Sequence, residues 1–143
     1  MNVVVISDPH GDFEAIQEVV RKNPHMDSYL CLGDSCLKDI SPFASVKGNC
    51  DFCLNYPLFL NIDTPYGLMH LEHGLYGYSE EFVLNKGCKI FLSGHTHRRH
   101  ALKYDDVYVF NPGSISRPRD GKKSYLVLDI EENEVKYEFK YLE

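Results

Sequence analysis

The sequence predicts an α/β sandwich with mixed β-sheets, and three observations lead to this fold class. Short apolar runs alternate with helical patterns in the first part of the chain, whereas mostly strand-like segments follow. Glycine-containing turns come directly after several of these runs. With 143 residues, 43% of them hydrophobic, the chain suits one ordinary domain, so we expect a single domain over residues 1–143.

The first expected elements are a strand, a helix and a second strand. Residues 2–7 form a short β-branched run, which is typical of a strand buried on both faces. Residues 12–22 carry apolar side chains at helical spacing, and Asp12 can cap the start of that helix. Residues 28–32 are predicted to form the second strand, which ends just before Gly33 and Asp34.

Strand-like segments dominate the rest of the chain. We expect strands over residues 58–62, 67–71 and 88–92, and a helix that opens at Ser79 and ends at Gly87. At the C-terminus, residues 124–130 precede a polar turn, and residues 135–141 alternate between apolar and polar side chains. That arrangement is typical of a β-hairpin.

The charge balance limits the possible partners. A formal net charge of −6 argues against sequence-independent binding to long nucleic acid, which relies on a basic surface. One segment departs from this balance, because residues 98–123 hold seven basic and three acidic residues. If this segment lines a site, it would attract a small anion, and Arg117 and Arg119 are candidates for contacting a phosphate.

Nothing in the sequence predicts export or a membrane segment. The N-terminal apolar run is too short for a signal peptide, and no stretch approaches the ~18 uncharged residues of a membrane helix. We therefore expect a cytoplasmic protein. Five cysteines, an odd number, favour reduced thiols, and a single Cys-x-x-C pair, Cys50 with Cys53, argues against structural zinc.

Polar residues crowd the turns after the predicted strands, which is where ligands bind in open α/β sheets. These residues are Asp8, His10, Asp34, Asn49, His73, His95 and His97. Asp8 and His10 are two positions apart, so in extended backbone their side chains would point the same way. The same holds for His95 and His97. Two such pairs, together with the single residues, could surround a pair of metal ions.

The donor set of this cluster determines which metals it suits. Four imidazoles, two carboxylates and one amide oxygen, without a thiolate, favour Mn²⁺, Fe²⁺, Zn²⁺, Ni²⁺ or Co²⁺ over Mg²⁺ alone. One carboxylate can bridge two ions, and two ions ~3.5–4 Å apart form a clamp for phosphoryl transfer. Each motif alone is more common in packing or on a surface, so the combination carries the prediction.

These motifs, in this order, resemble the successive blocks of the calcineurin-like metallophosphoesterases. The blocks are Ser7-Asp8-Pro9-His10-Gly11-Asp12, Gly33-Asp34, Gly48-Asn49-Cys50-Asp51, His73-Gly74, Gly94-His95-Thr96-His97 and Asn111-Pro112-Gly113-Ser114. The third and last blocks are similar to those of the small single-domain prokaryotic phosphodiesterases. The resemblance runs from residue 3 to about residue 120. It implies one metallophosphoesterase domain, a four-layer α-β-β-α sandwich with two mixed β-sheets, and a dinuclear metal site.

The family pattern assigns the ligands residue by residue. It places Asp8, His10, Asp34 and His97 on the first metal, and Asp34, Asn49, His73 and His95 on the second, with Asp34 bridging. We expect two divalent ions, manganese first, with iron, nickel, zinc or cobalt as alternatives. The implied reaction is hydrolysis of a small phosphoester substrate, most readily a phosphodiester. A metal-bridging hydroxide would attack phosphorus in line while the metals and Asn49 neutralise the growing charge.

Protonation of the leaving group is where this chain departs from larger family members. They place a histidine after the asparagine of the third block, whereas Cys50 stands there in this chain. The thiol of Cys50, the carboxyl of Asp51 or water could supply the proton. The candidate catalytic residues beside the metals are therefore Asn49, Cys50 and Asp51. Leu75 is a second departure, since many relatives have His-Gly-His there, but no ligand should be lost.

Residues around the cluster have structural interpretations as well. His70 precedes His73 in a predicted strand and is expected to be packed rather than to bind metal. The block 111–114 is either a plain turn or a support for the metal pocket.

Two alternative functions stay open at this point. A catalytically weak scaffold of the same fold, like the retromer subunit that the chain also resembles, would bind protein partners instead of turning over a substrate. A redox control through a Cys50–Cys53 bond is the other. The oligomeric state is also open, and a homo-oligomer is possible.

Overall fold

The computed structural model describes residues 1–143 and contains two five-stranded β-sheets. The first sheet has the order β10-β9-β1-β2-β3. Its strands are β1 (Asn2–Ile6), β2 (Ser28–Cys31), β3 (Ala44–Ser45), β9 (Ser124–Ile130) and β10 (Val135–Tyr141). β1, β2 and β3 run parallel to one another, whereas β9 and β10 add antiparallel pairs.

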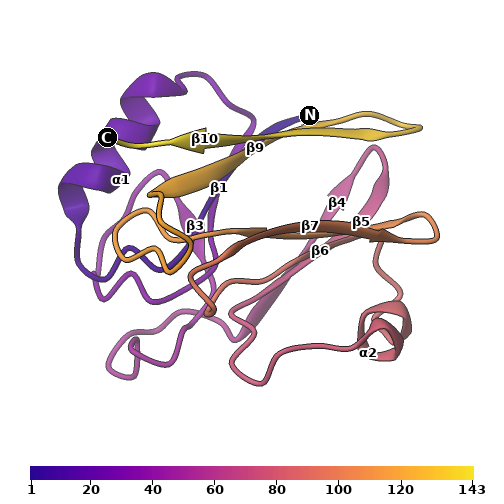
Figure 1. Cartoon of the computed structure of the whole chain (residues 1–143), viewed down its shortest axis with the longest axis horizontal. Helices are drawn as coiled ribbons and strands as arrows, with labels where there is room; N and C mark the ends of the chain where they lie inside the picture. The colour runs from indigo at the N-terminus through magenta and orange to yellow at the C-terminus, as the bar shows by residue number, and fades with distance from the viewer.

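The second sheet has the order β4-β5-β6-β8-β7 and is also mixed. Its strands are β4 (Phe59–Thr64), β5 (Gly67–Glu72), β6 (Ile90–Leu92), β7 (Arg99–Tyr104) and β8 (Val107–Pro112). The central strands β5, β6 and β8 are parallel, and β4 and β7 form antiparallel edges. The two sheets stack, with α1 (Phe13–Lys22) and α2 (Glu80–Asn85) on opposite outer sides (Figure 1). This is the expected four-layer sandwich.

Alternation along the strands divides the core into layers. In β1, Val3 and Val5 belong to the apolar cluster between the sheets, whereas Val4 and Ile6 pack with residues of α1. All four are fully buried, so the prediction of a strand buried on both faces is confirmed. In β6, Phe91 points the other way from its neighbours and packs against Val83 of α2.

Both helices begin where the sequence predicted. Asp12 caps α1 by accepting a hydrogen bond from the Ala15 backbone N–H at 3.1 Å. Ser79 caps α2, because its hydroxyl accepts a hydrogen bond from the Phe82 N–H at 3.1 Å. No helix is long and apolar enough to cross a membrane.

The hairpin of β7 and β8 has no counterpart among the strands expected from the sequence. The two strands pair from Arg99 with Pro112 to Tyr104 with Val107. β8 supplies buried Phe110 to the layer between the sheets, and its end leads into the block 111–114. The hairpin is therefore part of the basic segment, and Phe110 packs it into the core between the two sheets.

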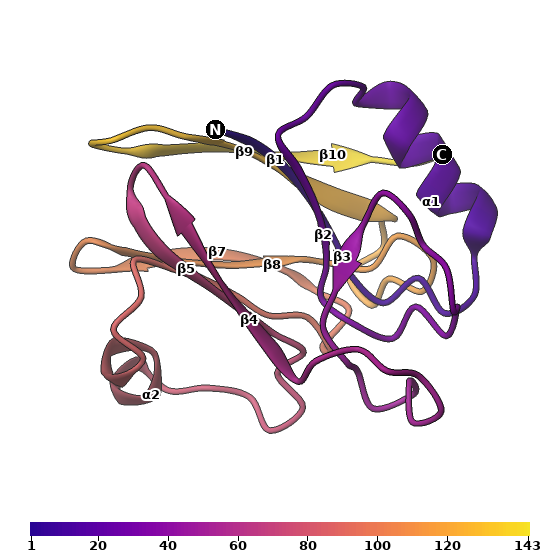
Figure 2. The same cartoon turned by 180° about the vertical axis from the view of Figure 1, so that it is seen from behind.

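The parallel strands of both sheets end on the same side of the molecule. The loops after β1, β2 and β3 and those after β5, β6 and β8 gather there, seen from behind in Figure 2. Backbone hydrogen bonds tie these loops together: Asp8 N donates to Gly33 O at 3.0 Å, and Gly94 N donates to His73 O at 3.0 Å. This convergence positions the candidate site.

Candidate metal centre

The polar residues singled out in the sequence converge in this loop region. Asp8 and His10 follow β1, Asp34 follows β2, Asn49 follows β3, His73 follows β5, and His95 and His97 follow β6. Their side chains form two groups of possible metal ligands, in each of which the ligand atoms lie within 4.8 Å of one another. One group is Asp8, His10 and His97, and the other is Asp34, His73 and His95.

Asp34, a member of the second group, also approaches the first group. Its Oδ2 is 3.3 Å from His73 Nε2 and 3.9 Å from His10 Nε2. Asn49 joins the second group, since its Oδ1 is 2.9 Å from His73 Nε2. Each group thus combines imidazole nitrogen with carboxylate oxygen, and Asp34 is the carboxylate that approaches histidines of both groups.

The backbone of these residues differs from the expected extended form. Five of the seven residues have a positive φ, between 46° and 72°. They are Asp8, His10, Asp34, His95 and His97. The left-handed region is costly for residues other than glycine and is concentrated at functional sites. The side chains of each pair therefore converge through tight left-handed turns, and the explanation by strand alternation was wrong.

Asp8 carries a buried oxygen that accepts no hydrogen bond. Its Oδ2 accepts hydrogen bonds from the Ser7 hydroxyl at 2.6 Å and from the His95 backbone N–H at 3.0 Å. Its Oδ1 has no hydrogen-bond partner, although the side chain is fully buried. A buried carboxylate oxygen without a donor is destabilising unless a cation faces it. This oxygen points toward His97 Nε2, 3.3 Å away, inside the first group.

Two of the histidines are oriented by backbone carbonyls. His73 Nδ1 lies 2.7 Å from Leu32 O, and His97 Nδ1 lies 2.7 Å from Arg117 O. A carbonyl only accepts hydrogen bonds, so each Nδ1 carries the proton and each Nε2 is directed at the carboxylates. Metal-binding histidines are commonly fixed in this way.

The charges of the cluster are strongly coupled. Burial would raise the pKa of the Asp34 carboxyl, but hydrogen bonds from His73 and from the Cys50 backbone N–H lower it to about 2. Burial disfavours the charged form of His73, yet the neighbouring carboxylates of Asp34 and Asp8 raise its pKa above the ordinary value. The facing carboxylate of Asp8 raises the pKa of His97. Two buried carboxylates therefore draw positive charge into the site.

These residues fit divalent metal ions. The two groups present imidazole nitrogen and carboxylate oxygen, the donors that suit borderline divalent ions. The unpaired Asp8 Oδ1 and the Nε2 atoms of His10 and His97, only 3.3 Å apart, converge as possible ligand atoms. A cation between them would satisfy both the carboxylate and the ring lone pairs.

Comparison with known proteins assigns the family. A model of the calcineurin-like phosphoesterase superfamily domain matches residues 1–133. The chain belongs to the calcineurin-like phosphoesterase superfamily. It is 31% identical over 144 residues to a probable metallophosphoesterase, YsnB, of Bacillus subtilis, covering 92% of this chain and 85% of that protein.

Two further relatives bear on the activity and the fold. The phosphodiesterase YfcE of Escherichia coli K12 is 34% identical over 99 residues, which cover 59% of this chain and 51% of YfcE. A crystal structure of a predicted phosphoesterase from Streptococcus pneumoniae superposes with a TM-score of 0.86 at 28% identity, covering 98% of this chain and 88% of that one.

Asp51 holds two loops of the domain together. It is fully buried, and its Oδ2 accepts hydrogen bonds from the Asp34 and Gly48 N–H groups, each at 2.8 Å. Its Oδ1 accepts one from the Cys36 N–H at 3.0 Å. Asp51 therefore ties the loop after β2 to the loop after β3, and this arrangement does not favour it as a proton donor.

Cys36 is a neighbour of the site that the sequence interpretation missed. The ligand atoms of His10, Cys36 and Cys50 lie within 4.8 Å of one another, so Cys36 approaches Cys50 across the loops. Burial, helped by Asp51, raises the pKa of Cys36 to about 11. Burial and Asp34 also raise the pKa of Cys50. All five cysteines are free, and no sequence spacing links residues 36 and 50.

The block 111–114 supports the site, one of its two expected roles. Ser114 Oγ donates to the Asp8 carbonyl at 2.8 Å, and Asn111 Nδ2 donates to the Gly94 carbonyl at 3.0 Å. His70 is packed, as expected, with its ring stacked on Phe59 and Phe91. It lies outside both ligand groups.

The basic segment reaches the candidate metal centre. A cavity of about 370 Å³ is lined by residues of both ligand groups and by Arg117 and Arg119. Both arginines are exposed, and the Arg119 N–H donates to the His97 carbonyl at 2.9 Å. A small anion would therefore be attracted to the cavity beside His97.

Proposed function

We propose that the chain is a dinuclear metal-dependent phosphodiesterase. The observation that carries this proposal is the pair of nitrogen and oxygen ligand groups joined by Asp34, with the buried Asp8 Oδ1 left without a hydrogen bond. Membership of the phosphoesterase superfamily supports the reaction class, and the name of YfcE supports diesters as substrates.

In this proposal each ligand group holds one divalent ion. Asp8, His10, Asp34 and His97 would hold the first ion, and Asp34, Asn49, His73 and His95 would hold the second. When bound, such ions activate a water molecule as nucleophile and neutralise charge on the phosphoryl oxygens. We expect manganese, with iron, nickel, zinc or cobalt as alternatives, because geometry and availability select among similar ions.

The chain's own residues bind and orient the phosphoester. With Asn49 Oδ1 directed at His73, its amide Nδ2 is the donor that can reach a phosphoryl oxygen. Arg117 and Arg119 attract the anionic substrate into the cavity. Cys50, an exposed thiol whose raised pKa keeps it protonated, is the candidate donor to the leaving group. We assign Asp51 a positioning role.

Metal content and hydrolysis of bis(4-nitrophenyl) phosphate test the proposal together. The purified protein should bind about two divalent ions and release nitrophenolate. Asp34→Asn and His73→Ala should lose this activity while their circular dichroism spectra match that of the wild type. Wild-type rates in both variants would show that the ligand assignment is wrong.

The same protein preparation distinguishes the scaffold alternative from the enzyme. A chain that acts by binding partners should hold its fold but cleave no ester in a broad panel of phosphoesters, even when loaded with manganese. The complete set of candidate ligand residues favours turnover. Burying carboxylates lowers the stability of the fold, and a scaffold that only binds partners gains nothing from it.

A further inference from the structure

A second cavity opens directly from the candidate metal centre. Its volume is about 520 Å³, within the usual range for small-molecule sites, and Asn49 and His73 form part of its wall. Most of the exposed surface of this wall is apolar, although Lys47 and Glu72 also line it. We call its apolar residues the apolar arm; they are Phe52, Leu58, Leu75 and Tyr76.

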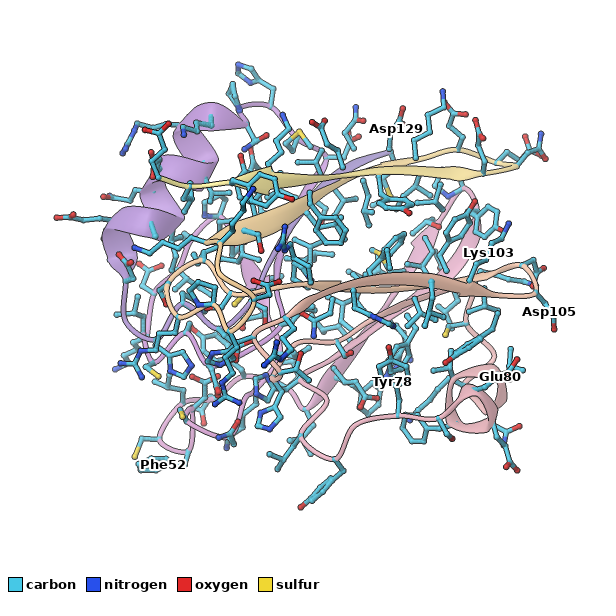
Figure 3. All side chains as sticks on the ribbon, in the orientation of Figure 1. Phe52, Tyr78, Glu80, Lys103, Asp105 and Asp129 are labelled. Atoms are coloured by element: carbon cyan, nitrogen blue, oxygen red, sulfur yellow. The ribbon has the colours of Figure 1, made fainter.

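The side chains of the apolar arm are unusually exposed. Phe52 is 78% exposed, Leu58 73% and Tyr76 96%. Phe52 projects from its loop at the periphery of the molecule, away from both sheets (Figure 3). Single exposed apolar residues are ordinary, but several around one cavity mark a binding surface. None of the three is held in the core, so folding does not account for their positions.

The two cavities at the centre have different chemistry. The cavity with Arg117 and Arg119 is cationic, whereas the apolar arm contributes hydrophobic side chains. Asn49 lines both cavities, so they meet at a residue of the second ligand group. A ligand centred on the metals would thus meet charge on one side and apolar rings on the other.

We propose that the apolar arm binds an aromatic ring, aryl or nucleobase, carried by the phosphodiester that the centre cleaves. This deepens the proposed function and rests on it. The rings of Phe52 and Tyr76 offer faces for stacking, and the cavity volume accommodates a ring system. Continuity with Asn49 and His73 selects a group attached to the substrate over a separate partner, because the occupant must reach the metal centre.

The arm should act mainly on binding. It lies beside the ligand residues and contributes no acid, base or nucleophile of its own, so it holds substrate and transition state alike. Loss of the two rings should raise KM for aromatic diesters and leave kcat nearly unchanged. Stacking on one aromatic side chain contributes roughly fivefold or more to affinity.

Calorimetric titration of the manganese-loaded protein tests the arm without turnover. The probes are phenylphosphonate and methylphosphonate, which share the anionic group but differ in the ring. The wild type should prefer phenylphosphonate by about fivefold or more, and the Phe52→Ala/Tyr76→Ala double variant should lose that preference. Phe13→Ala is the matched control: Phe13 is an exposed phenylalanine on α1 that lines neither cavity, and its removal should leave the preference intact.

A tryptophan reporter gives a second readout, because the chain contains no tryptophan. Tyr76→Trp keeps a ring in the arm and supplies the only indole fluorescence. Saturation with 4-nitrophenylphosphonate should quench it strongly, whereas methylphosphonate should not. The control variant Phe13→Trp should show no quenching by either compound at the same concentrations.

The outcomes separate this proposal from the one on which it rests. Hydrolysis of bis(4-nitrophenyl) phosphate with an unchanged phosphonate preference in the double variant would overturn the arm alone. Failure of the loaded protein to bind either phosphonate or to cleave the diester would overturn the proposed function, and the arm with it. A change in sedimentation of the double variant without a change in phosphonate preference would assign the surface to a second copy of this chain and also overturn the arm.

Discussion

Gly48 leaves space beside Asp34 that no larger residue could leave. A Cβ at this position would overlap Oδ1 of Asp34 and the Asp34 backbone N–H. Gly48→Ala should therefore displace the carboxylate that joins the two ligand groups. We expect metal affinity to fall about 10- to 100-fold, the range for residues that position ligands. Metal titration with a chelating competitor measures the loss.

Gly87→Ala provides the matched control for Gly48→Ala. A Cβ at Gly87 meets nothing within 4 Å, and the residue lies after α2, away from the centre. Its φ of +69° means that alanine should lower stability but leave metal affinity unchanged. Equal metal affinities in the two variants would show that Asp34 tolerates the methyl group.

Proton release on metal binding follows from the two histidines with raised pKa values. His73 and His97 hold protons to higher pH than ordinary histidines, because the carboxylates of Asp34 and Asp8 favour their charged forms. Metal ligation requires neutral imidazole, so an ion must displace these protons, and apparent affinity should fall as pH is lowered. Asp34, with a pKa of about 2, is already ionised near neutral pH and releases none.

Calorimetry measures this release directly. Titrations at one pH near neutrality, in two buffers of different ionisation enthalpy, should give different apparent binding heats. Their difference, divided by the difference in ionisation enthalpy, gives the number of protons released. His97→Asn should reduce the difference, since it removes one of the two groups. Identical heats in both buffers would contradict the charge assignment.

Cys50 is expected to matter only for poor leaving groups. Burial and the carboxylate of Asp34 raise the pKa of its thiol, so Sγ stays protonated near neutral pH. An alkoxide needs a proton as it departs, whereas nitrophenolate does not. Cys50→Ala should lower kcat for an alkyl phosphodiester about tenfold or more and leave kcat for bis(4-nitrophenyl) phosphate nearly unchanged. Equal losses on both substrates would place Cys50 in a structural role.

At the scale of single elements, β1 and β6 were the most predictable strands. β1 and β6 are short apolar runs whose residues face a core on both sides, so their composition alone identifies them. The hairpin of β7 and β8 escaped notice because β7 is an edge strand with a mixed pattern of burial. Arg99 and Lys103 lie within β7, and because of their charge we interpreted this part of the sequence as a basic segment instead of a strand.

Asn111, at the end of β8, holds the loop that carries His95 and His97, and removing its side chain should loosen the candidate metal centre. Asn111 Nδ2 donates to Gly94 O at 3.0 Å and to Thr96 Oγ1 at 3.1 Å, and so fixes the turn that carries His95 and His97. Asn111→Ala should cost about 1–3 kcal/mol of unfolding free energy through the unpaired Gly94 carbonyl and lower metal affinity about tenfold or more. Urea denaturation and metal titration measure the two effects. Asn55→Ala, at an exposed residue, should change neither quantity.

At the scale of the whole molecule, the two sheets contribute different candidate ligands to the proposed centre. The loops after β1, β2 and β3 carry Asp8, His10, Asp34 and Asn49, and the loops after β5 and β6 carry the other histidines. The motifs in the sequence singled out all seven residues, and the structure brings their side chains together. The sequence could not show the left-handed turns, the approach of Cys36 to Cys50 or the apolar arm, because these depend on loop contacts that no local pattern encodes.

Because the centre spans both sheets, metal binding should stabilise the packed molecule as a unit. Ions that bind only the folded chain raise the unfolding free energy by about 2.7 kcal/mol at a free concentration 100 times Kd. We therefore expect manganese to raise the thermal midpoint and a chelator to lower it again. Asp34→Asn should abolish the metal-dependent rise, because it removes the carboxylate shared by the two groups.

Met69→Ala separates this metal effect from packing. Met69 is fully buried between the sheets and belongs to neither ligand group, so its truncation should cost about 2–5 kcal/mol in the metal-free protein. The increment that manganese adds should nevertheless be preserved, since the ligand loops keep their residues. The contrary result is that manganese stabilises Asp34→Asn but not Met69→Ala. That result would mean that the ions stabilise the chain at a place other than the junction of the two sheets.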